Sequence, residues 1–234
     1  MIEVPIYYDA WMDNAIENLY TILNEVEGVK ASLTPEKLVF EITDYPKFIK
    51  NFQRVIKERM NEVIFVNVVN EKTGEVRNVK KDYILPQYGK KVEGKNVLKE
   101  RIYSDTEKRL NDVFKNLKEG NKICILCGRH FSKSVDKLKQ RVYPFATKIR
   151  SLSGVRTMKN LKEYNESLCP LCYLLGSLEW TDKGIIFRSY ITRGNQRYST
   201  IFLPLLRNLQ TLNEVKKMQR KALIEFYSRP RVFF

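Results

Sequence analysis

Residues 124–127, CILC, and 169–172, CPLC, hold all four cysteines of this chain in two identical CxxC spacings. A tetrahedral zinc ion takes four thiolates about 2.3 Å from the metal, and a two-residue spacer presents both sulfurs of a pair to one point. We therefore expect Cys124, Cys127, Cys169 and Cys172 to bind one structural Zn²⁺. Gly128 follows the first pair directly and suits the close backbone approach of such a knuckle.

Other uses of the cysteines stay open at this stage. They could form two independent disulfides, which are uncommon in a reducing cytosol, or two separate redox sites. His130, the only histidine, could replace one cysteine as a ligand. A catalytic zinc is disfavoured, because four thiolates close the coordination sphere and leave no position for water.

The 41 residues between the two pairs form a long insertion that is rich in Lys and Arg, with aromatic residues interleaved. Cations can hold phosphates, and aromatic rings can stack on bases. We expect nucleic-acid contact here; the alternative is a solvated basic surface over a small aromatic core. A Gly-centred turn between two strands, residues 192–197, is a second candidate. The candidate contact residues are Arg129, Lys133, Lys148, Arg150 and Arg156 in and beside the insertion, and Arg193 and Arg197 in the turn.

The whole chain shares this basic bias. Its 234 residues carry 42 Lys and Arg against 27 Asp and Glu, a net charge of +15, so a polyanion is the first partner to consider. Residues 1–45 carry a net charge of −7, and the remaining residues carry +22. Acidic and basic elements could also pair with each other in the fold. The sequence shows no apolar run long enough to span a membrane and no signal peptide, which predicts a cytoplasmic protein with no membrane partner.

Hydrophobic periodicity predicts an α+β fold. Residues 1–79 indicate an N-terminal mixed α/β unit: strands at 2–8, 37–42 and 62–69, a strand through Val79, a helix capped by Asp9 and a helix that opens at Asp44. Residues 80–120 indicate a basic connector and a helix with a capping box at Ser104. Residues 121–180 form the four-cysteine zinc module, and residues 181–234 form a strand hairpin and a C-terminal helix from about 204 to 227.

Motifs of catalysis are mostly missing. Residues 89–96 resemble a phosphate-binding P-loop, but Asn96 stands where a Ser or Thr hydroxyl would ligate Mg²⁺. One histidine limits nucleophilic triads, and we expect no carboxylate cluster beyond ordinary helix surfaces. The sequence therefore predicts a binding protein and not an enzyme.

The segments CILCGR, YPF and SLCPLC, after an N-terminal helix that begins DAWMDNAIENL, resemble the large subunits of type I CRISPR interference complexes (Cascade), in the CxxC–CxxC branch of type I-A and I-B systems. The likeness covers mainly residues 1–30 and 120–205. Many large subunits continue into a C-terminal helical bundle, whereas only one helix follows Pro204 here. We expect the bundle to be a separate small subunit, or the chain to be a fragment.

This resemblance implies a non-catalytic subunit near the 5′ handle of the guide RNA. Such subunits recognise the protospacer-adjacent motif in duplex DNA, help to open the duplex and recruit the helicase-nuclease. The implied partners are guide RNA, target double-stranded DNA, the backbone and small subunits of Cascade, and the helicase-nuclease. The alternative is a stand-alone zinc-stabilised DNA- or RNA-binding protein in replication, repair or RNA processing.

Overall fold

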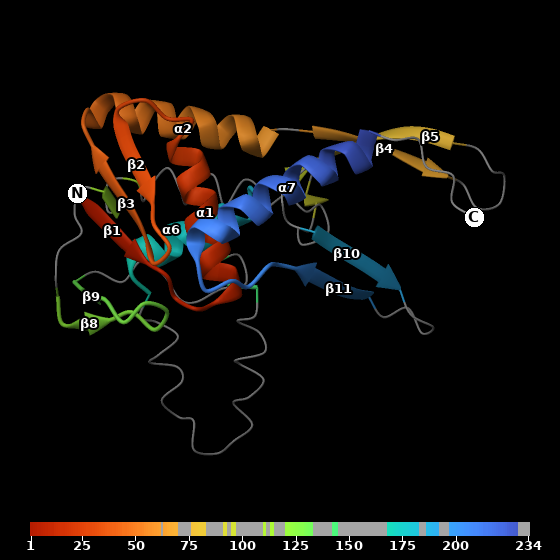
Figure 1. Cartoon of the computed structure of the whole chain (residues 1–234). Coiled ribbons are helices and arrows are strands. Elements are labelled where there is room, and N and C mark those ends of the chain that lie inside the picture. The colour runs from red at the N-terminus through yellow and green to blue at the C-terminus, as the bar shows by residue number, and fades with distance from the viewer. Residues whose placement is uncertain are drawn as a thin grey trace, which may run out of the picture.

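Helices and small antiparallel sheets alternate along the computed structural model (Figure 1). It describes residues 1–61, 63–69, 76–82, 91–92, 95–96, 110, 113–114, 120–132, 142–144, 168–182, 186–191 and 197–228. Within these ranges no helix is long and apolar enough to cross a bilayer.

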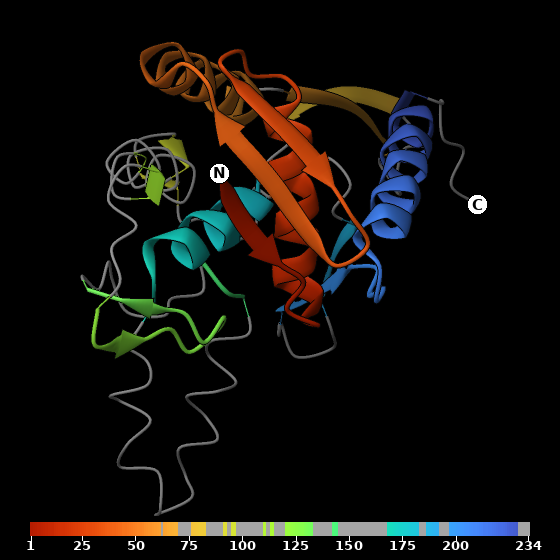
Figure 2. The same cartoon turned by 60° about the vertical axis from the view of Figure 1, so that its left-hand side comes forward.

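The N-terminal strands form a three-stranded antiparallel sheet in the order β1 (Ile2–Pro5), β3 (Lys37–Ile42), β2 (Val29–Leu33). Helix α1 (Ala10–Leu23) lies across one face of this sheet (Figure 2). It begins where predicted, because the Asp9 carboxylate caps it by accepting from the backbone N–H groups of Trp11 and Met12, both at 2.9 Å.

Helix α2 (Tyr45–Asn61) lies at the periphery and leads into the hairpin of β4 (Val63–Val69) and β5 (Val76–Asp82) (Figure 1). Three further two-stranded pairs follow among the residues that the structure describes. They are β6 (Lys91–Val92) with β7 (Lys95–Asn96), β8 (Lys122–Ile123) with β9 (His130–Phe131), and β10 (Ile186–Ile191) with β11 (Arg197–Phe202). Helices α6 (Pro170–Glu179) and α7 (Leu209–Ser228) complete the described elements.

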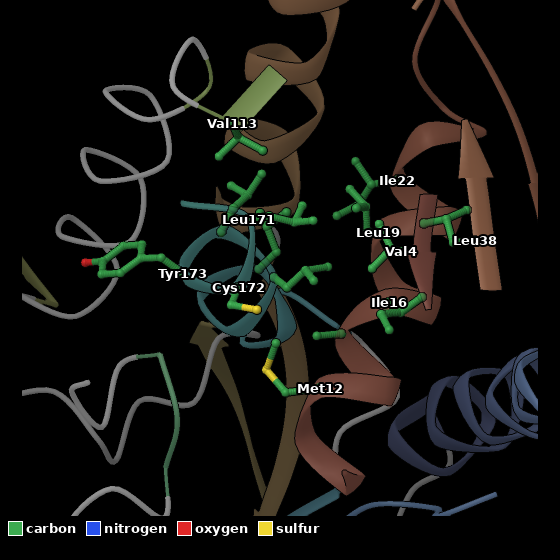
Figure 3. Close-up of a cluster of buried hydrophobic side chains, with 14 of the residues drawn as sticks. Val4, Met12, Ile16, Leu19, Ile22, Leu38, Val113, Leu171, Cys172 and Tyr173 are labelled. Carbon is green, nitrogen blue, oxygen red and sulfur yellow. The ribbon is translucent and has the colours of Figure 1, made fainter. Parts of the chain in front are cut away.

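Helix α1 is the centre of the core, because the sheet, α6 and α7 all pack against it. Figure 3 shows Leu171 and Cys172 of α6 in one apolar cluster with Met12 and Ile16 of α1. The Trp11 indole lies 4.8 Å from the Trp180 ring, centroid to centroid. Its N–H donates to the carbonyl of Val142 at 2.7 Å and, at 3.2 Å, to that of Gly176. The cysteine-bearing helix is therefore built into the same core as the N-terminal sheet.

A mixed α and β fold is confirmed in this coarse form. Strand β2 and helix α6 were not predicted. The helix expected after Ser104 lies mostly outside the described residues, which include its buried Leu110 and Val113. The four domain boundaries remain predictions.

The acidic N-terminal segment pairs in part with the basic remainder of the chain. Glu25 accepts from Arg59 at 2.5 Å, Glu27 from Lys47 at 2.8 Å and Glu17 from Arg220 at 2.5 Å. Internal pairing therefore accounts for a share of the charge asymmetry.

Candidate metal centre

The four cysteine sulfurs converge on one point. All four Sγ atoms lie within 4.8 Å of one another, and those of Cys127 and Cys169 are 3.7 Å apart. Sulfurs placed tetrahedrally at about 2.3 Å from a zinc ion would be about 3.8 Å apart. All four cysteines are free thiols, so the two disulfides do not form in this structure. The donor set and its spacing fit a single metal ion.

A knuckle presents the first pair. Strands β8 and β9 flank it, and the backbone N–H groups of Cys124 and Gly128 donate to the carbonyls of Arg129 at 2.9 Å and Cys124 at 2.8 Å. Gly128 has φ +67°, and a Cβ built on it would meet no atom within 4 Å. The left-handed backbone therefore explains this glycine, and the expected close backbone approach is wrong.

The second pair opens helix α6. Cys169 is the N-cap, and its sulfur accepts from the backbone N–H of Cys172 at 3.4 Å. Pro170 occupies the first helical turn, where its missing N–H costs nothing. The N–H of Cys169 donates to Cys124 Sγ at 3.4 Å, which joins the two pairs. Because the helix N-terminus carries positive partial charge, it stabilises thiolates at this position.

The N-terminal segment is a third partner of the centre. The Tyr7 hydroxyl lies 3.7 Å from Cys172 Sγ. Beside it, the Arg129 guanidinium donates to the Glu3 carbonyl at 3.0 Å, and the Tyr143 hydroxyl donates to the α1 cap Asp9 at 2.6 Å. Three chain segments thus meet at the sulfurs, so a bound ion would cross-link residues far apart in sequence.

Proximity and burial set the protonation of the thiols. Hydrogen bonds from neighbouring cysteines, first Cys127, lower the pKa of Cys124, whereas burial raises the pKa of Cys172. Metal binding would therefore release the remaining thiol protons. Burial also raises the pKa of Tyr7, so its hydroxyl stays protonated beside Cys172, whose thiol donates to it.

The structure describes only some of the other candidate residues. His130 is exposed and is not part of the sulfur cluster. Arg129 lies beside the knuckle, with its guanidinium engaged by the Glu3 carbonyl. Arg197 opens β11 opposite Ile191. Lys133, Lys148, Arg150, Arg156 and Arg193 lie outside the described residues.

The structure also contains a cluster of buried charged residues that the sequence does not predict. The expectation of no carboxylate cluster beyond ordinary helix surfaces is therefore wrong. Glu17 of α1, Glu179 of α6 and Asp182 converge on two cations of α7. Lys216 Nζ lies 2.5 Å from Asp182, 3.1 Å from Glu179 and 3.5 Å from Glu17. Arg220 bridges Asp182 at 2.8 Å and Glu17 at 2.5 Å. Two cations thus face three carboxyls, and these contacts fix α7 against α1 and α6.

Two buried carboxyls, one on α1 and one on α6, have raised pKa values. Burial raises the pKa of Glu179 to about 8, against the opposing effect of Lys216. Burial raises the pKa of Asp13 to about 6. Such buried polar positions on α1 have the spacing of a solvent-facing stripe, so periodicity alone could not identify them.

No family model, curated protein or solved structure matches this chain. The functional evidence is therefore the converging sulfurs and the basic charge of the chain itself.

Proposed function

We propose that this chain is a non-catalytic nucleic-acid-binding protein whose fold is stabilised by one structural Zn²⁺. The observation that carries the proposal is the convergence of Cys124, Cys127, Cys169 and Cys172 within 4.8 Å. A tetrahedral set of four thiolates is typical of zinc or iron–sulfur sites. Zinc is favoured because CxxC knuckles are its common structural ligands, and a closed set of four sulfurs supplies a cross-link and not a reactive position.

Nucleic acid is the proposed partner because of charge. A net charge of +15 on 234 residues favours a dense polyanion. Internal pairing uses part of the acidic N-terminal segment, yet the basic excess of the whole chain remains. Phosphate contacts by Lys and Arg supply the sequence-independent part of such binding.

More specifically, we propose the large subunit of a type I CRISPR-guided surveillance complex, which binds guide RNA and target duplex DNA, recognises the protospacer-adjacent motif and helps to recruit the helicase-nuclease. The proposal rests on the resemblance stated above. Two segments that carry it, the N-terminal helix and the second CxxC pair, pack against each other as α1 and α6. In such a complex guide pairing selects the target, and the protein reads only the flanking motif.

The test is co-expression of the full chain with repeat-binding backbone subunits and a guide RNA. We expect co-purification with the guide RNA, and tighter binding of target duplexes that carry one particular flanking trinucleotide. The purified complex should not cut DNA without the helicase-nuclease. A stable monomer that binds duplex DNA with no preference for a flanking trinucleotide would overturn this assignment and favour a stand-alone zinc-stabilised DNA- or RNA-binding protein.

A further inference from the structure

Helix α2 carries a stripe of cations on its outer side. Lys47, Lys50, Arg54 and Lys57 follow one another at intervals of three, four and three residues, and all four are exposed. This spacing places them on one face of the helix. The opposite face, which includes Phe48, Phe52, Val55 and Ile56, is buried in the core. The buried face fixes the helix, and α2 itself lies at the periphery of the fold in both views (Figures 1 and 2).

Part of the positive charge of the stripe is not paired with an acidic residue in the described part of the chain. Lys47 pairs with Glu27 at 2.8 Å, and Arg54 pairs with Glu58 at 2.9 Å, both in exposed positions where such pairs contribute little. No hydrogen bond or ion pair joins Lys50 or Lys57 to any residue that the structure describes. Two lysines are therefore available to an external anion, and the exposed partners of the other two could yield to one.

No other described helix offers such a face. Helices α1 and α6 are largely covered by neighbouring elements. The described outer face of α7 mixes Lys217 and Lys221 with Glu214 and Met218. From Lys47 to Lys57 the α2 stripe spans about 15 Å at a helical rise of about 1.5 Å per residue. Phosphates on one DNA strand recur about every 3.4 Å of duplex axis, so the stripe is as long as about four phosphate steps.

We propose that the outer face of α2 binds the phosphate backbone of a nucleic acid. The inference rests on the proposed nucleic-acid-binding function and adds a surface that the sequence did not single out. Charge complementarity selects this occupant: spaced cations with no apolar residue among them fit a repeating anion better than a folded protein surface. The lysines contact phosphates and not base edges, so the contact is independent of sequence.

The test compares two charge-matched variants of the full chain. Lys50→Gln with Lys57→Gln removes two charges from α2, and Lys217→Gln with Lys221→Gln removes two from α7. Each is titrated with a labelled 24-base-pair DNA duplex and with a single-stranded RNA at several KCl concentrations. We expect the slope of log affinity against log salt to fall by about 1.8 on duplex DNA for the α2 variant, at about 0.9 per lost contact. The α7 variant should keep the wild-type slope.

The outcomes separate this inference from the proposed function. Wild-type binding with equal slopes for wild type and the α2 variant would overturn the α2 surface and leave nucleic-acid binding standing. Equal losses in both variants would also overturn it, because the effect would then be one of net charge. A wild-type chain that binds neither nucleic acid would overturn both. Lys50→Arg with Lys57→Arg should restore the wild-type slope, since it restores the charge.

Discussion

The sulfur of Cys127, in the knuckle after β8, lies 3.7 Å from the sulfur of Cys169 at the start of α6, although 42 positions separate the two residues. One ligand belongs to a hairpin with little buried surface and the other to a helix in the central core. A metal ion held between them would therefore anchor the hairpin and its long insertion to that core.

Substitutions of Cys169 distinguish its role as a metal ligand from its role as the N-cap of α6. Cys169→Ser keeps an oxygen that can cap α6, whereas Cys169→Ala removes both the ligand and the cap. We expect both variants to lose zinc and several kcal/mol of unfolding free energy, with Cys169→Ala about 1 kcal/mol less stable than Cys169→Ser. Zinc content and urea unfolding measure this. A Cys169→Ser protein with a full complement of zinc would contradict it.

Gly176 is required by the close approach of Val142. A Cβ at Gly176 would lie 2.1 Å from the Val142 carbonyl oxygen, which also accepts from the Trp11 indole. We expect Gly176→Ala to lower the unfolding free energy by about 1–3 kcal/mol through overpacking. The control is Ser177→Ala on the same helix, because that buried hydroxyl has no partner among the described residues. Equal unfolding midpoints for the two variants would refute the contact.

Some elements of this fold follow from the local sequence, whereas others depend on contacts between residues far apart in the chain. Asp9 caps α1 where the sequence predicts it, because N-capping depends on neighbouring backbone N–H groups. Helix α6 was missed because Cys169 serves both as a predicted ligand and as a cap. The spacing of Cys169 and Cys172 predicts a metal site and gives no separate sign of a helix start. The burial of Glu17 was missed because it depends on α7, about 200 positions away in sequence. Long-range packing of this kind leaves no local signal.

Lys216 is the central cation of the buried ionic cluster. Replacing it with Met would leave Glu17, Glu179 and Asp182 buried with Arg220 as their remaining cation. Breaking a buried pair by removing one partner costs about 3–5 kcal/mol, so Lys216→Met should be strongly destabilised. Its exposed neighbour provides the control, and Lys217→Met should change stability by less than about 0.5 kcal/mol. Chemical denaturation compares the two. Similar values would show that the cluster contributes little.

Glu179 should make stability depend on pH. Its pKa is about 8 in the folded chain and 4.5 ordinarily, because burial outweighs the attraction of Lys216. Between these values the folded state holds a proton that the unfolded state has lost. The free energy of unfolding should therefore fall as pH rises from about 4.5 to about 8 and then level off.

The measurement compares wild type with Glu179→Gln, an uncharged isostere, at saturating zinc. The pKa of Asp13 is also raised, but only to about 6. Measurements between pH 6.5 and 8 therefore report on Glu179 and not on Asp13. Here the wild type should lose up to about 1.4 kcal/mol per pH unit relative to the variant. Glu17, Asp182, Lys216 and Arg220 face the same carboxyl and are unchanged in both proteins. Parallel pH profiles would show that Glu179 is ionised throughout.

We propose that four sulfurs hold one zinc ion and so tie distant segments of the chain together. X-ray absorption at the zinc edge, with metal content measured on the same purified chain, examines this site. We expect one zinc per chain, ligated by four sulfurs at about 2.3 Å. A metal-free protein that folds and melts as the metal-loaded one does, or a zinc ion ligated mainly by nitrogen and oxygen, would contradict it.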